Sequence, residues 1–138
     1  MFTYRQNTVP SQRELLDLYN SVGWSSYTQN PERMVPMVEN SWLVWTAYDD
    51  GALVGLIRVV GDGLTIAYIQ DLLIAPEYQR RGIASELLSR VVESVSEIRQ
   101  VFISTDSQAG NQHVIDFYLS RGFADITEQE CITLARFL

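Results

Sequence analysis

Residues 69–88 form the stretch of this chain whose residue types and spacing best suit chemistry. An apolar run there ends in the turn sequence Gln79-Arg80-Arg81-Gly82-Ile83-Ala84, and an amphipathic helix pattern follows directly. The first N–H groups of a helix lack partners within it and the helix dipole is positive at that end, so a helix start binds anions. Gly82 would let the backbone approach a ligand closely, and the two arginines before it add positive charge. This order of elements predicts a turn that binds pyrophosphate.

A plain strand–turn–helix connection with solvated arginines would produce the same string, and a short glycine motif on its own favours that interpretation. The context favours the anion site. A strand pattern precedes the turn, a helix pattern follows it, and a second motif appears downstream at residues 111–123.

The charge composition limits the kinds of site and substrate that the chain can have. The 138 residues carry a net charge of −7, and all 10 basic residues are arginine. Without lysine the chain has neither a P-loop nor a lysine Schiff base. An acidic chain disfavours non-specific binding of nucleic acid and favours a cationic small substrate, although acidic surfaces also serve solubility alone.

Length and composition predict one cytoplasmic, metal-free domain that spans residues 1–138. The single cysteine, Cys131, excludes a disulfide framework, and the single histidine, His113, disfavours a zinc site. No apolar run reaches the ~20 residues of a membrane span, and the N-terminus has no secretory pattern. We expect no catalytic role for His113, in a first helical turn, or for Cys131, in a strand without a histidine nearby in sequence.

Periodicity predicts an α+β fold in which a mixed sheet carries helices on its faces. The capping box Ser11-Gln-Arg-Glu14 begins the first helix, and Asn111 is expected to cap the last one. Helix patterns cover residues 10–23, 30–38, 82–98 and 111–121. Strand patterns cover residues 42–48, 52–60, 65–74 and 101–105, with a closing pair at 123–126 and 131–137. The segment from Trp24 to Tyr27 is expected to be an aromatic loop.

Two motifs of this chain, in their order along the sequence, resemble motifs of the GNAT acyltransferase superfamily. Gln79, Gly82 and Ala84 match its Q/R-x-x-G-x-G/A motif, with alanine where many members carry glycine. The aromatic residues and glycine of its F-Y-x-x-x-G-F ending are matched by Phe117, Tyr118, Gly122 and Phe123. The element order agrees over nearly the whole chain. The resemblance implies a GNAT-like fold with a mostly antiparallel sheet, a splayed central pair of strands and about four flanking helices.

The resemblance also implies acetyl-CoA as the cosubstrate. The pantetheine arm would bond to the backbone of the strand before the turn, at Leu72, Leu73 and Ile74. The pyrophosphate would lie on the backbone N–H groups of Arg81, Gly82, Ile83, Ala84 and Ser85. Gln79 belongs to the same motif, Arg80 would add a charge-assisted contact, and Asn111 would contact CoA or only cap its helix. The thioester would lie in the gap between the splayed strands.

The implied reaction is direct attack of a primary amine on that thioester, with a backbone N–H near Leu73 polarising the carbonyl. Tyr118 is the candidate for protonating the leaving thiolate. The transfer from an ordinary tyrosine is uphill by roughly 2 kcal/mol, and a depressed pKa would ease it. Spacing alone favours a core tyrosine at this position, and the family motif favours the catalytic role. Asp71 is the candidate base, with Glu77 close behind, and the alternatives are solvated carboxylates and deprotonation through water.

Trp24 and Tyr27 are the candidates for lining the acceptor site, because the loop between the first two helices does so in this family. Packing of that loop is the alternative explanation. The implied acceptor is a small-molecule amine, such as a polyamine, an amino acid or an aminoglycoside-like molecule. Acetylation of a protein or peptide amine and a non-catalytic CoA-binding domain are the alternative functions. We expect no nucleic-acid or membrane partner, and the family resemblance allows a homodimer.

Overall fold

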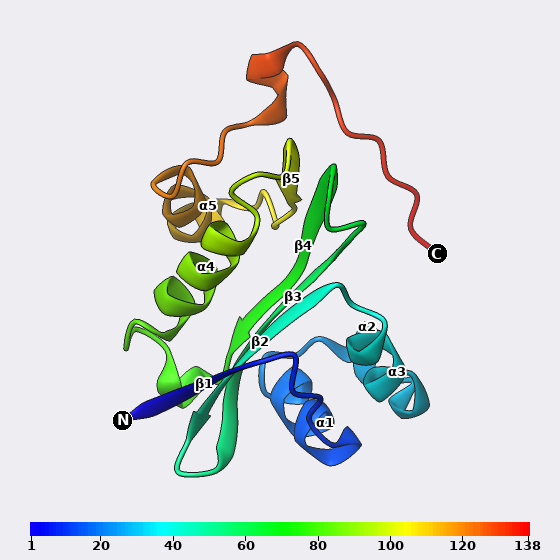
Figure 1. Cartoon of the computed structure of the whole chain (residues 1–138), viewed down its shortest axis with the longest axis vertical. Coiled ribbons are helices and arrows are strands. Elements are labelled where there is room, and N and C mark those ends of the chain that lie inside the picture. The colour runs from blue at the N-terminus through cyan, green and yellow to red at the C-terminus, as the bar shows by residue number, and fades with distance from the viewer. The chain divides into compact units, whose positions relative to one another are not determined.

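The computed structural model describes residues 1–138, apart from the side chain of Ala109 (Figure 1). The chain divides into two compact units, Met1–Ile103 and Ser104–Leu138. The first unit holds a five-stranded sheet in the order β1-β2-β3-β4-β5. Its strands are β1 (Phe2–Gln6), β2 (Leu43–Asp49), β3 (Ala52–Gly61), β4 (Ile66–Ile74) and β5 (Gln100–Ile103). Neighbouring strands are antiparallel from β1 to β4, and β5 joins β4 in parallel. The predicted mixed, mostly antiparallel sheet is therefore confirmed, with β1 as a strand that the sequence patterns missed.

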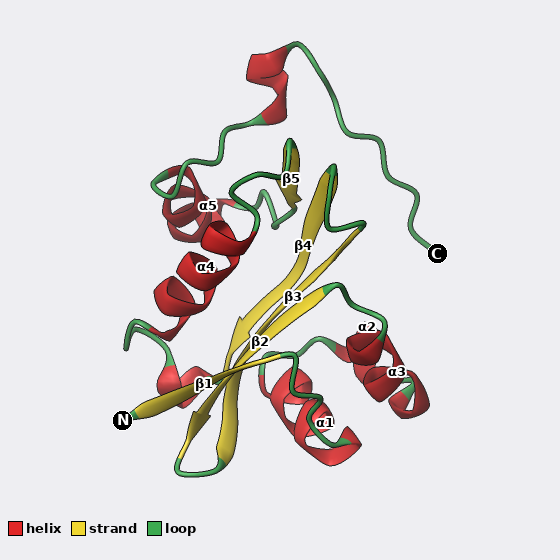
Figure 2. Cartoon of the chain, in the orientation of Figure 1, coloured by secondary structure: helices red, strands yellow, loops and turns green.

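Helices cover both faces of this sheet (Figure 2). The helices of the unit are α1 (Gln12–Ser21), α2 (Ser25–Thr28), α3 (Met34–Glu39) and α4 (Ile83–Ser94). Leu15 and Met34, from α1 and α3, share a buried cluster with Leu56 of β3. The adjacent Gly55 faces Ile83 of α4 instead. Because successive residues of a strand point to opposite faces, α1–α3 and α4 lie on opposite sides of β3. The described part of the chain contains no helix long and apolar enough to cross a membrane.

The start of α1 follows from local sequence, as predicted. Ser11 Oγ accepts a hydrogen bond from the Glu14 N–H at 3.1 Å, and Glu14 Oε1 accepts one from the Ser11 N–H at 3.0 Å. This reciprocal pair satisfies two backbone donors that the helix itself leaves without partners. The buried face of α1 includes Tyr19, whose hydroxyl becomes part of the candidate site.

The central strands separate partway along β4. Pairing between β4 and β5 runs from Ile66↔Gln100 to Ile69↔Ile103, so residues 70–74 of β4 continue beyond β5. The pairing with β3 shifts at the same point, because Arg58 pairs with Asp71 and the next residue of β3 pairs with Ile69. Gln70 is therefore the extra residue of a β-bulge on β4. Bulges redirect side chains and occur next to active sites, and this one lies where the predicted splay begins.

Gly55 lets α4 pack closely against the sheet and so positions the turn that precedes this helix. A Cβ atom on Gly55 would lie 2.8 Å from Ile74 Cδ1, 3.2 Å from Ile83 Cγ2 and 3.4 Å from Leu87 Cδ1. We expect Gly55→Ala to lower the free energy of unfolding by about 1–3 kcal/mol through overpacking, measured by urea denaturation. Gly110→Ala is the matched control, since a Cβ at Gly110 meets no atom within 4 Å. Equal losses in the two variants would contradict this account of Gly55.

The second unit contains α5 (Gln112–Leu119) between two short 3-10 turns, Ala109–Asn111 and Ile126–Gln129. The predicted closing strands at 123–126 and 131–137 are wrong, because the described backbone of residues 104–138 forms no strand. Asp125 caps the second turn instead, where its carboxylate accepts hydrogen bonds from Thr127. Alternating apolar residues favour a strand, but a strand also needs a partner whose N–H and C=O groups pair with its own.

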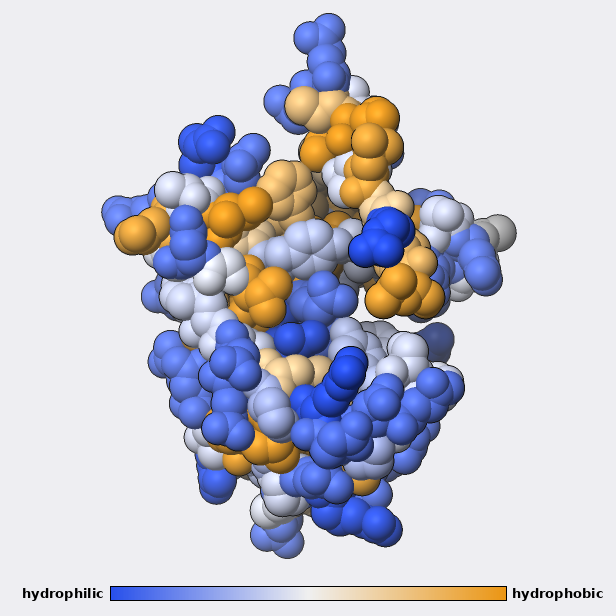
Figure 3. Space-filling view, turned by 90° about the vertical axis from the view of Figure 1, so that its right-hand side faces the viewer, coloured by the Kyte–Doolittle hydropathy of each residue, from blue (hydrophilic) through white to orange (hydrophobic). Residues whose placement is uncertain are grey.

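Apolar side chains lie open to solvent in several parts of the surface, drawn in orange in Figure 3. In the C-terminal segment the large exposed ones are Ile132, Leu134, Phe137 and Leu138. Other boundaries differ modestly from the predictions. Ser25–Thr28 forms the short helix α2 rather than a loop, and α4 ends at Ser94 rather than near residue 98.

Candidate active site

The turn between β4 and α4 has the geometry that an anion site requires. Arg80 and Gly82 adopt left-handed conformations, with φ of 63° and 84°. The first hydrogen bond of α4 joins the Glu86 N–H to the Gly82 carbonyl at 3.0 Å, so the N–H groups of Ile83 and Ala84 lie before the helical ladder. Gly82 occupies the N-cap position and has no side chain that could accept from these donors. The N-cap position of this 12-residue helix therefore supplies no side-chain hydrogen bond to the first N–H groups.

The space above this turn is open. A Cβ atom on Gly82 would meet no other atom within 4 Å, so an external group can approach the backbone there. Arg80 and Arg81 are exposed beside it, and the Arg81 guanidinium lies 5.1 Å from the centre of the Tyr78 ring. Backbone donors, open space and two cations suit a pyrophosphate group, so the residues present fit the phosphate end of acetyl-CoA.

Gln79 holds the turn against the end of β4. Its side-chain Nε2 donates to the Ile74 carbonyl at 3.1 Å, and the Ala75 N–H donates to the Val54 carbonyl of β3 at 2.9 Å. The motif glutamine therefore has a structural partner in the chain, and its contact with CoA stays a prediction. Contacts of Leu72, Leu73 and Ile74 with pantetheine also stay predictions, on the stretch of β4 that extends beyond β5.

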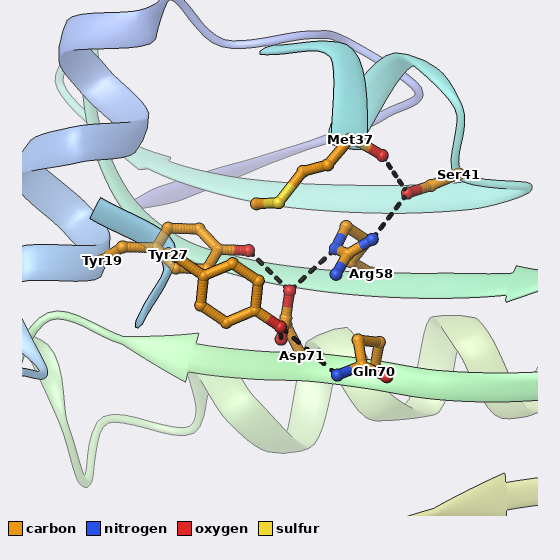
Figure 4. Close-up of polar contacts among 7 residues, drawn as sticks. All are labelled: Tyr19, Tyr27, Met37, Ser41, Arg58, Gln70 and Asp71. Atoms are coloured by element: carbon orange, nitrogen blue, oxygen red, sulfur yellow. Dashed lines mark hydrogen bonds and ion pairs between the residues drawn. The ribbon is translucent and has the colours of Figure 1, made fainter. Parts of the chain in front are cut away.

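Asp71 lies at the centre of a buried hydrogen-bond network (Figure 4). Its side chain is 2% exposed and accepts at Oδ2 from Arg58 Nε at 2.7 Å. Tyr19 donates its hydroxyl proton to the same oxygen at 2.8 Å, and Tyr27 donates to Oδ1 at 2.6 Å. At the outer end, Gln70 Nε2 donates to the Tyr27 hydroxyl oxygen at 3.3 Å. The network thus runs from a buried ion pair out to the bulge residue of β4.

Electrostatics keep the two tyrosines of this network protonated. Burial raises the pKa of Tyr19, and the charge of Asp71 and the hydrogen bond to it raise that pKa further. The same causes, in the same order, raise the pKa of Tyr27. Burial would lower the pKa of Arg58, but the charge of Asp71 and their hydrogen bond outweigh it, so that pKa is raised. Arg58 therefore stays a cation and Asp71 has a permanent counter-charge.

The two residues predicted to line the acceptor site pack against this network. The rings of Trp24 and Tyr27 lie 6.2 Å apart, and the Tyr19 ring meets each of them edge-on, at 5.9 Å and 5.0 Å. Trp24 and Tyr27 are both half-buried, so each presents part of its ring to solvent. Trp24, Tyr27 and Asp71 are brought together as one site, whereas Glu77 is exposed on the turn after β4.

Sequence patterns missed three members of this site, which are Tyr19, Arg58 and Gln70. One signal was available, because Arg58 is a charged residue inside the apolar run of β3. A charge in a buried strand requires a partner, and Asp71 is the corresponding charge in β4. The pairing itself depends on the bulge at Gln70, which no local pattern revealed.

The second unit holds the other two predicted residues. Tyr118 is 9% exposed and packs against Phe117 and Phe123, with ring centres 5.4 Å and 6.2 Å away. Burial raises the pKa of Tyr118 to about 12, which is opposite to the depressed pKa that would ease proton transfer.

Asn111 is at the N-cap position of α5, but it makes no side-chain capping bond. Its amide instead donates to Thr105 Oγ1 at 2.9 Å and to the Asp106 carbonyl at 2.6 Å. The predicted capping bond is therefore wrong, because the side chain is engaged with the preceding loop. A contact of Asn111 with CoA stays a prediction. Among the residues described, no three acidic, histidine or cysteine side chains cluster as metal ligands would.

The chain is similar to known proteins in sequence and in fold. The model of the acetyltransferase (GNAT) family matches residues 10–123. An uncharacterized ycf52-like N-acetyltransferase from Prochlorococcus marinus is 35% identical over 130 residues, which cover 88% of this chain and 67% of the relative. The chain spans about two thirds or less of the length of the curated relatives that it matches.

Two solved structures share the fold over the whole chain. SP0256 from Streptococcus pneumoniae TIGR4, a GNAT-family acetyltransferase, is 32% identical with a TM-score of 0.85, covering 100% of this chain and 98% of the other. The aminoglycoside acetyltransferase HMB0005, from an uncultured soil metagenomic sample, is 18% identical with a TM-score of 0.71, covering 100% and 99%. The second likeness concerns the fold alone. Together they confirm the predicted GNAT-like α+β fold.

Proposed function

Because this chain belongs to the GNAT acetyltransferase family, we propose that it transfers the acetyl group of acetyl-CoA to a primary amine of a small cationic acceptor. Family membership implies acetyl-CoA as the donor, which supplies an activated thioester. The observation that carries the proposal is the open space at Gly82, at the start of α4, on the turn that follows a strand extending beyond its neighbour. An enzyme of this kind needs both features, one for the pyrophosphate and one for the extended pantetheine arm.

The donor would be held along β4 and the turn after it. The N–H groups of Arg81, Gly82, Ile83, Ala84 and Ser85 are proposed to bind the pyrophosphate, with Arg80 adding charge. The backbone of Leu72–Ile74 is proposed to bond to pantetheine as an added strand would. The open space at Gly82 and the extension of β4 past β5 support this placement.

In the proposed reaction the amine nitrogen bonds to the carbonyl carbon, the carbon–sulfur bond breaks, and the sulfur leaves as a thiolate. Tyr118 is proposed to give its hydroxyl proton to the thiolate, and the tyrosinate then regains a proton that the amine has lost to solvent. With the pKa of Tyr118 at about 12, this transfer is uphill by roughly 5 kcal/mol. A turnover of ~10 s⁻¹ corresponds to a barrier of about 16 kcal/mol, so the proton transfer is smaller than the barrier.

Asp71 is proposed to act through its hydrogen bonds rather than as the group that takes the amine proton. A general base must reach its substrate, and the side chain of Asp71 is 2% exposed. Its oxygens already accept hydrogen bonds from Tyr19, Tyr27 and Arg58, so they are engaged with partners inside the protein. The amine would then lose its proton to water, which was the alternative that needs no side chain.

An acceptor screen tests the proposed activity. We expect the purified chain to release free CoA thiol from acetyl-CoA when a small cationic amine such as spermidine, lysine or sisomicin is added. The net charge of −7 supports this class of acceptor. A peptide with a free N-terminus serves as the control for the alternative acceptor class. Thiol release with the peptide and with none of the small amines would contradict the proposed acceptor.

A further inference from the structure

We propose that Tyr27 and Gln70 bind the ammonium group of the molecule that is acetylated. The Asp71 network makes this binding point one of oxygen atoms that accept hydrogen bonds. This inference rests on the proposed function in one respect, that the bound ammonium belongs to the molecule that is acetylated. It assigns chemistry to four residues, Tyr19, Tyr27, Arg58 and Gln70, around the carboxylate at which their contacts meet (Figure 4).

The Tyr27 hydroxyl proton points to Asp71. A tyrosine hydroxyl can donate one hydrogen bond and accept others, so the direction in which it points decides what it recognises. Here the proton is directed to Asp71 Oδ1 over 2.6 Å, a short, charge-assisted bond. The hydroxyl oxygen of Tyr27 is therefore left as an acceptor toward any other partner.

Arg58 and Tyr19 hold the carboxylate of Asp71 in place. A buried charge is costly unless it is paired and hydrogen-bonded. The Arg58 guanidinium supplies the counter-charge with a bond of 2.7 Å to Oδ2, and Tyr19 donates to the same oxygen at 2.8 Å. Oδ1 is left to accept from Tyr27. Ser41 holds the other end of the guanidinium, accepting from Arg58 Nη1 at 3.4 Å. Arg58 and Tyr19 are thus positioning residues that act through Asp71.

A ligand can reach the Asp71 network at Tyr27 and Gln70. Asp71 and Arg58 are buried, so a ligand cannot reach their charges directly. Tyr27 is half-buried and Gln70 is exposed, and the two side chains meet where Gln70 Nε2 donates to the Tyr27 oxygen at 3.3 Å. Gln70 is also the bulge residue at which β4 parts from β5. The accessible end of the network therefore lies at the start of the gap in the sheet.

These features match a primary ammonium better than a cation without N–H groups. An ammonium group carries N–H donors and no acceptor, which complements the oxygen of Tyr27 and the side-chain carbonyl of Gln70. The partly exposed rings of Trp24 and Tyr27 would attract any cation, including one without N–H groups. Hydrogen bonding to oxygen adds discrimination that the rings alone lack. The site should therefore prefer a primary ammonium to a trimethylammonium of the same chain length.

Titration of the ¹⁵N-labelled full chain with hexylammonium and with hexyltrimethylammonium tests this preference, without acetyl-CoA present. We expect the Gln70 side-chain amide and the Trp24 indole resonances to shift with hexylammonium, at concentrations about 10-fold lower than with the trimethyl compound. Tyr27→Phe should weaken the binding of hexylammonium by about 10- to 100-fold, as expected for a lost hydrogen bond to a charged group. Binding of the trimethyl compound should be nearly unaffected. Tyr4→Phe, which removes the hydroxyl of a half-buried tyrosine in β1, is the matched control and should bind as the parent does.

Asp71→Asn tests the positioning step, because its amide can donate to the Tyr27 oxygen and turn the Tyr27 proton outward. We expect this variant to lose the preference for the primary ammonium while Tyr27 is still present. If Asp71→Asn does not fold, Gln70→Leu tests the exposed end of the site instead, and it should reduce the preference.

Equal binding of the two compounds by the parent, or no shift at Gln70 and Trp24 up to 100 mM, would overturn the inference. Calorimetry with acetyl-CoA separates this inference from the proposed function. Acetyl-CoA binding without ammonium recognition at Gln70 would overturn the inference alone, and ammonium recognition without acetyl-CoA binding would overturn the proposed function.

Discussion

Gly82→Glu is expected to abolish measurable binding of acetyl-CoA, raising its Kd by more than about 100-fold. The side chain would project into the open space above the turn, where no atom of the protein lies within 4 Å of the Cβ position. Its carboxylate would face the pyrophosphate at the start of α4, and such a like-charge contact costs several kcal/mol. Since ~2.7 kcal/mol already corresponds to 100-fold, electrostatic repulsion alone is sufficient for the loss.

Two considerations distinguish this loss of acetyl-CoA binding from unfolding of the variant. A negative charge at a helix N-terminus stabilises the helix, so α4 should remain formed in Gly82→Glu. The backbone at Gly82 has φ of 84°, which asparagine tolerates better than most residues, so Gly82→Asn is the matched control for bulk without charge. We expect Gly82→Asn to weaken binding much less than Gly82→Glu. Unchanged affinity in Gly82→Glu, measured by calorimetry, would place the pyrophosphate elsewhere.

Tyr118→Phe is expected to lower kcat by about 10- to 100-fold while the Kd of acetyl-CoA stays within about twofold of the parent. The variant removes one hydroxyl and keeps the ring that packs against Phe117 and Phe123, so the second unit should retain its local packing. A loss confined to kcat indicates an interaction made in the transition state. Equal values of kcat in variant and parent would remove Tyr118 from the proposed mechanism.

The pH dependence gives a second test of the same assignment. Burial raises the pKa of Tyr118 to about 12, so the protonated form needed for an acid persists throughout the usual assay range. We expect kcat of the parent to show no fall attributable to this group below about pH 10. A basic limb near pH 8–9 that disappears in Tyr118→Phe would contradict a raised pKa for the catalytic acid.

The turn at Gly82 could be predicted from sequence because its determinants are local. A strand, a glycine that allows a left-handed backbone and an amphipathic helix follow one another within residues 69–88, and the structure places them in that order. The capping box at Ser11 and Glu14 is similar, since both partners lie three residues apart. Local patterns of this kind need no knowledge of the rest of the fold.

The Asp71 network could not be predicted in full because it depends on contacts between distant parts of the chain. Tyr19 comes from α1, Tyr27 from α2 and Arg58 from β3, and they meet only when the sheet register and its bulge are known. The closing strands failed for the opposite reason. Their alternation of apolar residues is a local pattern, but a strand forms only by pairing with a neighbour, and the described backbone of residues 104–138 forms no strand.

The central claim is that the turn at Gly82 binds acetyl-CoA, and calorimetric titration of the purified chain with acetyl-CoA tests it most directly. NAD and ATP serve as controls, because NAD carries a pyrophosphate and ATP a triphosphate. We expect micromolar binding of acetyl-CoA and much weaker binding of the two controls. Absence of acetyl-CoA binding, or equal binding of all three compounds, would contradict the account.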